Sequence, residues 1–335
     1  MDDKNYTLLY MLTNTAYLHC REMAEATNFT EDVLQKIKKE LSCSPQYNLK
    51  VDNELKILSA QNIFLSITAF LGNTLVLVAL HREISLHPPS KLLYRNLAIT
   101  DLCVGIIAET LAVIYWISVV NESWKICYYA DLTATFTGNI LCAVTLCTLT
   151  VKSVDRLFAL SLGIRYRDVV TLRRAKITVT VMWVLSIVGA SSYFWNPVIT
   201  LWYRRIGLSL CLVIPTYSYT KIFLSLRHNQ VQIQGYGSEG QPSQPTPLNK
   251  ARYRKAVYSA LWVQVALVVC YMPFGIIRAL TPQIEMSSSV YLARQFASTL
   301  AYFNSSLNPL LYCLKIREVR KAVRDTIRGL VCSLN

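Results

Sequence analysis

Hydrophobic residues occur in long runs along this chain, and polar residues occur in the shorter stretches between them. A helix of about 20 apolar residues crosses the hydrocarbon core of a bilayer, which is about 30 Å thick. Runs long enough for this lie at 57–80, 92–118, 132–160, 177–200, 206–226, 256–280 and 291–314. The pattern therefore predicts an all-α integral membrane protein with a bundle of seven membrane-spanning helices.

Composition and charge agree with a membrane location. Hydrophobic residues make up 53% of the 335 residues and charged residues 16%, whereas charged residues make up about a quarter of a soluble domain. The net charge of +14 would in a soluble protein indicate a nucleic-acid partner. Here lysine and arginine are concentrated in the connections 81–91, 161–176 and 227–255 and in the tail from 315. Cytosolic loops carry such an excess, so we expect membrane lipids, and no nucleic acid, as partners.

The same distribution divides the chain into three predicted regions. Residues 1–56 form an extracellular segment, residues 57–314 form the bundle, and residues 315–335 form a cytosolic tail. The tail sequence KIREVRKAVRDTIRGLVC is basic and amphipathic, which predicts a helix on the membrane surface. The connection at about 229–249 is rich in Gly, Pro, Gln and Ser and is expected to be a disordered cytosolic loop. The expected location is the plasma membrane, with the N-terminus outside and the C-terminus inside.

Three glycosylation sequons agree with this orientation. They begin at Asn5, Asn28 and Asn121, which all lie in regions expected outside the cell. No cleavable signal peptide is evident in the first residues, so the first span is expected to direct insertion.

The residues needed for most enzymatic chemistry are missing from the spans. The four histidines lie outside them, the ten cysteines include no CxxC pair, and no phosphate-binding loop is present. Asp101 is the one carboxylate in a clearly central position, whereas an intramembrane aspartyl protease needs two. We therefore expect no enzyme, no zinc site and no organic cofactor.

Short polar motifs follow one another along the spans. The first span contains GNTLV with Asn73, the second NLAITDL with Asp101, and the third ends in VDRL. The later spans contribute Trp183, Pro215, Pro273 in CYMP, and the run NSSLNPLLY. Together these residues resemble the rhodopsin-like G-protein-coupled receptor family across about residues 57–330. The resemblance implies a receptor that binds an extracellular ligand and activates a heterotrimeric G protein by helix rearrangement.

Asp155 and Arg156 place two charges at the inner end of the third span, where charges are costly unless they lie at the membrane boundary or are paired. The resemblance implies that they pair in the resting receptor and that Arg156 turns toward the G protein on activation. Simple snorkelling of Arg156 to the interface is the alternative. The resemblance also implies activation roles for Tyr271, Pro273, Asn308, Pro309 and Tyr312, and G-protein contacts for Arg156, Ile164 and Lys255.

A lone carboxylate at mid-membrane, such as Asp101, is costly unless polar groups or an ion solvate it. The resemblance groups Thr145, Asn304 and Asn308 around it as a sodium pocket, so sodium is the candidate metal ion. One alternative is a water-filled polar cluster that only joins helices. Another is a transporter or channel that moves a proton or cation past Asp101, although we see none of the internal repeats that are common in transporters.

The outer half of the bundle indicates less about the ligand. Gly138 occupies the position where amine receptors of the family carry an aspartate, which argues against a monoamine. Arg278 and Arg294 are expected near the outer ends of the last two spans, with Arg204 nearby, and arginine is suited to a carboxylate or phosphate. We therefore expect a ligand with an anionic group, and we include Asp131 among the candidate ligand-binding residues. Alternatively, the arginines reach lipid headgroups or pair with acids, namely Asp131, Glu109 or Glu285.

The outer disulfide of the family is expected to be absent. Asp131 stands where the third span usually has a cysteine, and the short connection near 198–205 between the fourth and fifth spans contains none. The outer cysteines are Cys20, Cys43 and Cys127, and we expect a bridge between two of them. The sequence leaves open which two are joined.

Other departures from the family pattern concern residues expected to take part in the change between the resting and active states, which we call the switch. Leu157, Tyr271 and Phe223 replace residues that the family usually has at these positions, namely Tyr, Trp and Tyr. Tyr253 stands where many relatives carry an acid that holds the arginine from the sixth span. Because one restraint on Arg156 is missing, we expect measurable signalling without ligand.

Overall fold

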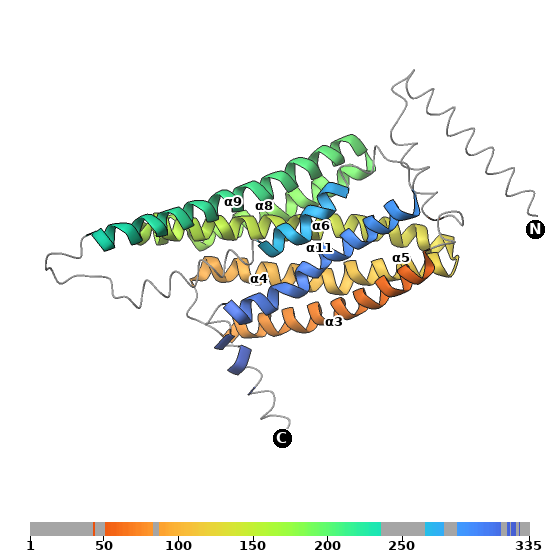
Figure 1. Cartoon of the computed structure of the whole chain (residues 1–335), viewed down its shortest axis with the longest axis horizontal. Helices are drawn as coiled ribbons and strands as arrows, with labels where there is room; N and C mark the ends of the chain where they lie inside the picture. Colours follow the sequence, from red (N-terminus) through yellow and green to blue (C-terminus); the bar gives the residue numbers. More distant parts are fainter. Residues whose placement is uncertain are drawn as a thin grey trace, which may run out of the picture.

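The computed structural model describes Cys43, residues 51–82, 87–235, 265–277 and 287–315, and the tail residues 320, 321, 323–325 and 328. Within these residues, seven long helical segments run alongside one another (Figure 1). In chain order they are α3 (Asp52–Arg82); α4 (Pro88–Cys103), which continues through the π-helical segment η2 (Val104–Glu109) into α5 (Thr110–Val120); α6 (Trp124–Ser161); α8 (Leu172–Ser191); α9 (Pro197–Gly235); the helix Val265–Ile277; and α11 (Ser288–Lys315). Short turns join neighbours, namely η3 (Gly163–Arg165), α7 (Tyr166–Val169) and η4 (Ser192–Phe194).

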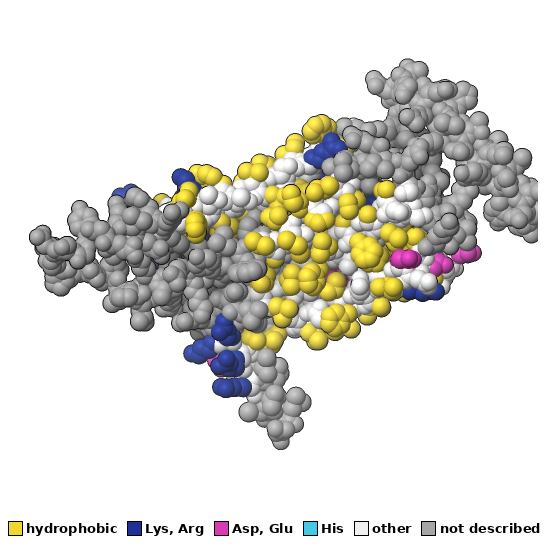
Figure 2. Space-filling view, in the orientation of Figure 1, with side chains coloured by type: hydrophobic (Ala, Val, Ile, Leu, Met, Phe, Trp, Pro, Cys, Tyr) yellow, Lys and Arg dark blue, Asp and Glu magenta, His cyan; other side chains and the backbone are white. Residues whose placement is uncertain are grey.

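The outside of the bundle is apolar and its interior contains polar residues. Among the described helices, five are long and apolar enough to cross a membrane. Large hydrophobic side chains are exposed, such as Phe64 (66%) and Val213 (63%), while Asp101 is completely buried. Figure 2 shows hydrophobic side chains across the middle of one face and charged side chains near its ends. This distribution suits a protein whose helices face lipid, as the hydrophobic runs predicted.

The buried hydrophobic residues form two clusters along the bundle. One cluster includes Tyr94, Leu97 and Leu149 and is called the inner cluster, because the sequence predicts its end of the bundle on the cytosolic side; the other includes Leu55 and Trp116 and is called the outer cluster. The tail joins the inner cluster through Val323, which is buried while its described neighbours Lys321, Arg324 and Asp325 are exposed. The helical tail residues that the structure describes therefore have the apolar and polar sides expected of an amphipathic helix.

Small residues allow α3 to approach its neighbours closely. A Cβ atom added at Gly72 would lie 2.9 Å from the ring of Pro309, so α3 and α11 touch at this glycine. A Cβ added at Gly105 in η2 would lie 3.0 Å from Ala69, and the carbonyl of Gly105 accepts a 2.8 Å hydrogen bond from Ser66 Oγ. Close approach at small residues and hydrogen bonds between helices are the main attractive contacts available in lipid.

Two predicted boundaries are wrong. The connection expected near 198–205 lies in a helix, because the chain turns at η4 and α9 already begins at Pro197. Arg204 and Arg205 interrupt the apolar run there without interrupting the helix, and the Arg205 guanidinium lies 5.8 Å from the centroid of the Trp202 ring. The loop expected at about 229–249 starts later, because α9 continues to Gly235. The rest of that loop lies outside the described residues.

Candidate functional site

Asp101 is the centre of a polar network between α4 and α11. Ser305 Oγ donates a 3.0 Å hydrogen bond to Asp101 Oδ1, and Asn308 Nδ2 donates a 2.7 Å hydrogen bond to Asp101 Oδ2. Hydrogen bonds to a charged group contribute about 1.5–3 kcal/mol each. The carboxylate of Asp101 therefore joins α4 to α11, just before Pro309.

The sequence predicted some members of this network and missed one. Asn308, which the resemblance grouped with Asp101, contacts it through its amide nitrogen, whereas Ser305 was not predicted, although it lies in the same polar run as Asn304 and Asn308. Thr145 and Asn304 are also buried, but the structure records no hydrogen bond from either of them to Asp101. Instead, the hydroxyl of Thr145, the amide nitrogen of Asn304 and the amide oxygen of Asn308 are buried without a hydrogen-bond partner.

Two further sets of bonds hold the helices around this network. Asn73 Nδ2 donates to the carbonyl of Ser305 at 3.1 Å, which joins α3 to α11. Trp183 Nε1 donates to Asn96 Oδ1 at 2.9 Å, and Asn96 Nδ2 donates to Thr148 Oγ1 at 2.8 Å. The latter chain connects α8, α4 and α6. Trp183 and Asn73 were among the motif residues, Asn96 begins the motif NLAITDL without having been singled out, and Thr148 was missed.

Asp155 is held by two hydroxyl groups at the inner end of α6. Ser90 Oγ donates to Asp155 Oδ2 at 2.9 Å, and Tyr166 Oη donates to Asp155 Oδ1 at 2.7 Å. Burial raises the pKa of the Tyr166 hydroxyl to about 12; the hydrogen bond with Ser90 opposes this shift and the bond to Asp155 adds to it. The acid therefore fixes the inner end of α4 and the short helix α7.

Arg156 has a different partner from the one expected. Its Nη2 donates a 2.6 Å hydrogen bond to Tyr94 Oη on α4. The structure records no ion pair between Asp155 and Arg156, so the expectation that these two residues pair with each other is wrong for this structure. The physical reason is that both oxygens of Asp155 already accept hydrogen bonds from Ser90 and Tyr166.

Lys152 is a charged residue of α6 that lies outside the predicted motifs. It lies one helical turn before Arg156, and its Nζ is 3.9 Å from the centroid of the Tyr94 ring. Its position in the run LTVKSVDRLFAL, before the charged pair, was the available signal. A lysine inside a membrane-spanning helix is rare enough to indicate a functional role.

The other predicted residues of the switch and of the G-protein surface lie as follows. Ile164 is 96% exposed on η3, after Gly163, whose φ of +50° suits glycine. Tyr271 is buried in the inner cluster, and Pro273 lies in the helix Val265–Ile277. Tyr312 belongs to α11. Lys255 and Tyr253 lie outside the described residues.

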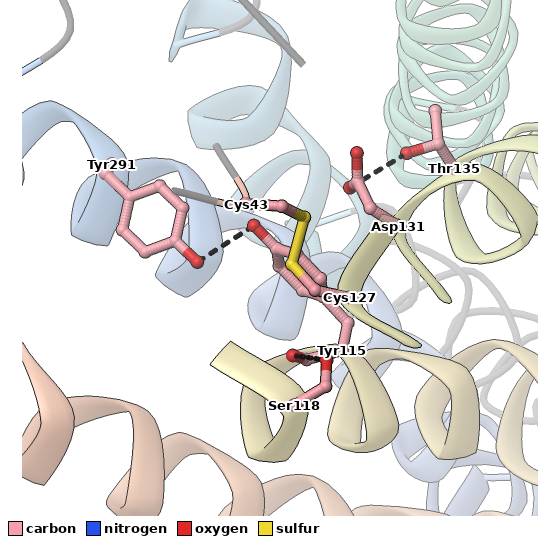
Figure 3. The surroundings of a disulfide bond; sticks show 7 residues. All are labelled: Cys43, Tyr115, Ser118, Cys127, Asp131, Thr135 and Tyr291. Carbon is pink, nitrogen blue, oxygen red and sulfur yellow. Dashed lines mark hydrogen bonds between the residues drawn. A yellow bond between two sulfur atoms is a disulfide. The ribbon is translucent and has the colours of Figure 1, made fainter. Parts of the chain in front are cut away.

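A disulfide closes the outer end of α6. Cys43 is bonded to Cys127, 84 positions later in the chain, with a Cα–Cα distance of 5.9 Å. This confirms the expected bridge between two of the three outer cysteines, while Cys20 lies outside the described residues. Beside the bridge, the hydroxyl groups of Tyr115 and Tyr291 are 2.9 Å apart (Figure 3). The segment before α3 is therefore tied to the mouth of the bundle.

The candidate ligand-binding residues that the structure describes come from α6, α9 and α11. Arg294 on α11 is half-buried, and within the described part of the chain its guanidinium has neither a hydrogen bond nor an ion pair. Arg204 on α9 donates from Nε to the carbonyl of Thr200 at 3.4 Å, and its charge lies close enough to that of Arg294 for the two to repel each other. Asp131 accepts a long 3.5 Å hydrogen bond from Thr135 (Figure 3).

The structure describes some of the other residues that the sequence placed in the outer half of the bundle or outside the membrane. A Cβ at Gly138 would lie 2.9 Å from Tyr302 Oη, so the missing side chain makes room for this tyrosine. Glu109 is completely buried and both of its carboxyl oxygens lack a hydrogen-bond partner. Asn121 is exposed after the end of α5. Arg278, Glu285, Asn5 and Asn28 lie outside the described residues.

Known proteins are similar in sequence to this chain over most of its length. A family model described as 7 transmembrane receptor (rhodopsin family) matches residues 72–194 and 188–312. Trace amine-associated receptor 6 of Pan troglodytes is 25% identical over 299 residues, which cover 80% of this chain and 84% of the relative. Adenosine receptor A2a of Homo sapiens is 26% identical over 305 residues, covering 79% and 70%. Galanin receptor 2a of Danio rerio is 25% identical over 291 residues, covering 82% and 78%.

Proposed function

The chain belongs to the rhodopsin family of seven-transmembrane receptors, and we propose that Asp101 and its neighbours form a sodium-sensitive element of its switch. As a member of this family, it is a multi-pass plasma-membrane protein that binds an extracellular ligand and activates a heterotrimeric G protein. Its relatives do not favour the alternative of a transporter or channel. The family is a class of receptors without enzymatic chemistry, and receptor signalling without catalysis or an organic cofactor is the proposed activity of this chain.

The proposed orientation places Cys43 outside the cell and the tail inside. Disulfides form in oxidising extracellular compartments, and the Cys43–Cys127 bridge lies at one end of the bundle. The sequon at Asn121 is exposed near the same end and is the glycosylation site that the structure supports; Asn5 and Asn28 are proposed from their sequons alone. Exposed lysine and arginine side chains at the start of α8, namely Arg173, Arg174 and Lys176, lie at the other end, as the positive-inside rule expects.

The observation that supports the sodium proposal is that the residues grouped with Asp101 contribute buried oxygen atoms without hydrogen-bond partners. Hard cations such as sodium prefer oxygen ligands. The Asp101 carboxylate supplies charge, and the Thr145 hydroxyl and the Asn308 amide oxygen are buried without a hydrogen-bond partner. Asn304 adds a buried amide group. These residues fit a small cation, which would neutralise the buried charge between α4 and α11; a cluster filled with water alone is the competing explanation.

Thermal unfolding of the purified receptor tests this proposal without a ligand. Replacing choline chloride in the buffer with sodium chloride at equal ionic strength should raise the unfolding midpoint of the wild type. An ion that binds only the folded state stabilises that state. Asp101→Asn should lose this increase. Glu54→Gln removes a carboxylate at the start of α3 and should retain it. Equal sodium responses in the wild type and Asp101→Asn would contradict the proposal.

The ligand is proposed to carry an anionic group that meets Arg294 and Arg204. Support comes from Arg294, which is half-buried and has no ion pair with any described residue, and from its repulsion with Arg204, because a carboxylate or phosphate between two cations relieves such repulsion. Arg278 is a further candidate from the sequence. Asp131 and Gly138 on α6 are further candidates for this site from the sequence, and Tyr302 fills the space beside Gly138.

Matched compounds test the preference for an anion. Carboxylates, phosphates and their neutral amides and esters should be compared in a second-messenger assay. Arg294→Ala should weaken an anionic agonist roughly tenfold or more, as expected from the loss of a charge-assisted hydrogen bond. Arg205→Ala removes an arginine that lies over Trp202 and should leave potency unchanged. Equal potency of the anionic agonist at the wild type, Arg294→Ala and Arg205→Ala would contradict the proposal and indicate that Arg294 contacts lipid headgroups.

The proposed G-protein surface combines Arg156 with Ile164 and Lys255. Arg156 and Ile164 are both exposed near the inner end of α6. Arg156→Ala is expected to prevent coupling while ligand binding persists, which nucleotide exchange and binding assays on the same preparation would check.

A further inference from the structure

Tyr94 is the side chain that holds Arg156 in this structure. Arg156 Nη2 donates a 2.6 Å hydrogen bond to Tyr94 Oη, which joins α6 to α4. The neighbouring acid, Asp155, accepts its hydrogen bonds from Ser90 and Tyr166 instead. The restraint on the arginine is therefore a phenol from another helix.

A second cation of α6 contacts the same tyrosine. Lys152 lies four residues before Arg156, and its Nζ is 3.9 Å from the centroid of the Tyr94 ring. A cation over the face of an aromatic ring is attracted by the negative charge density of that face. The ammonium group therefore stabilises the ring, while the hydroxyl group at the edge of the ring meets the guanidinium of Arg156.

The two partners of this hydrogen bond differ in their freedom to move. Tyr94 is 4% exposed and packs in the inner cluster with Leu97 and Leu149, so neighbouring side chains fix its position. Arg156 is exposed at the inner end of α6. Breaking the contact therefore needs only the arginine to leave.

We propose that Tyr94, supported by Lys152, is the positioning residue that retains Arg156 in the resting receptor. An arginine that meets a G protein has to leave Tyr94 Oη, so this hydrogen bond contributes to the equilibrium between the resting and active states. Lys152 acts through the ring, because it keeps the hydroxyl group directed at the arginine. This role of Tyr94 rests on the proposed G-protein contact of Arg156 and is independent of the proposed sodium and ligand sites.

Ligand-independent nucleotide exchange in reconstituted receptor tests the hydroxyl group directly. Receptor in lipid nanodiscs is mixed with purified heterotrimers of the Gs, Gi, Gq and G12 classes, and the uptake of GTPγS is followed. Tyr94→Phe removes only the hydroxyl group and should raise the exchange rate about threefold or more with the preferred heterotrimer. Tyr219→Phe is the matched control, because Tyr219 is a buried tyrosine near Arg156 without a recorded hydrogen bond to it; its rate should stay at the wild-type value.

Substitutions of Lys152 test its action through the ring. Lys152→Met should raise the exchange rate about twofold, whereas Lys152→Arg keeps a cation over the ring and should preserve the wild-type rate. In the Tyr94→Phe background, Lys152→Met should change nothing further, because the hydroxyl group that it positions is gone. A purely structural role of Lys152 would instead make the two effects independent.

Surface expression and the thermal unfolding midpoint are measured for every variant, since misfolding lowers exchange and the proposal requires an increase. Equal exchange by the wild type and Tyr94→Phe, whether both are active or both are silent, would overturn the role of Tyr94. Effects of Lys152→Met and Tyr94→Phe that multiply in the double variant would overturn the role of Lys152.

Discussion

Replacing Gly72 with alanine is expected to destabilise the receptor, although alanine is the better helix former. Gly72 lies where α3 meets α11, and an added Cβ would be 2.9 Å from both Cβ and Cγ of Pro309. The proline ring is closed onto its own backbone nitrogen, so a change of ring pucker can shift Cγ but cannot swing Cβ away, and the two helices have to move apart. Overpacking of this kind costs about 1–3 kcal/mol, which exceeds the gain of about 0.5–1 kcal/mol from removing a helical glycine.

Gly207 provides the matched control for this substitution. It also lies in a long helix, α9, but no atom lies within 4 Å of the position where its Cβ would be. Gly207→Ala should therefore show only the gain in helix propensity. Because that gain is common to both variants, their free energies of unfolding should differ by the overpacking cost alone, about 1–3 kcal/mol.

Thermal unfolding of the two purified variants, followed by tryptophan fluorescence, measures the difference. A change of 1 kcal/mol shifts the midpoint by roughly 2–4 °C in a domain of 150–250 residues, so Gly72→Ala should unfold at least about 2 °C below Gly207→Ala. If Gly72→Ala unfolds at the same or a higher temperature, α3 and α11 do not touch closely at this glycine, and the close packing described here is refuted.

Three further predictions concern single contacts. Non-reducing peptide mapping of surface receptor should recover a peptide that joins Cys43 to Cys127, and finding both as free thiols would contradict the bridge. Trp183→Phe should lower the free energy of unfolding by about 1 kcal/mol, because it removes the hydrogen bond to Asn96; an unchanged midpoint would show that this bond contributes nothing. The pKa of Tyr166 is raised from 10.0 to about 12, so its stabilising contribution is complete below pH 10 and is lost as the pH rises through about 12. The phenolate absorbance of the wild type minus that of Tyr166→Phe should therefore titrate near pH 12, and a midpoint near 10 would show that burial does not affect this hydroxyl group.

The sequence predicted the spans well because hydrophobic runs depend on local composition. It failed at Arg204 and Arg205, where two charges fall within an apolar run. A charged residue reads as the end of a span, yet a long side chain can lie along the helix and place its charge elsewhere. The Arg205 guanidinium does this by lying near the Trp202 ring, and the backbone remains helical.

Partners that are distant in sequence were harder to predict. The contact between Asp101 and Asn308 was expected only because the resemblance grouped these residues. The partner of Arg156 was missed because Tyr94 lies 62 positions away and reads as an apolar residue within the second span. An acid next to an arginine in sequence suggests a pair, but adjacent residues of a helix do not face each other. The geometry of α6 therefore favours partners on neighbouring helices for both.

The contacts between α4 and α6 suggest which part of the bundle stays still during activation. Within the described residues, three side-chain hydrogen bonds are recorded between these helices, namely Asn96 to Thr148, Ser90 to Asp155, and Arg156 to Tyr94. In the first two, both partners are at least partly buried, and Asn96 and Asp155 each have a further hydrogen bond with Trp183 or Tyr166. Only the third involves an exposed residue of α6. A rearrangement that frees Arg156 can therefore break this one bond while the other two hold α4 and α6 together, so the helices that move are expected to be others of the bundle.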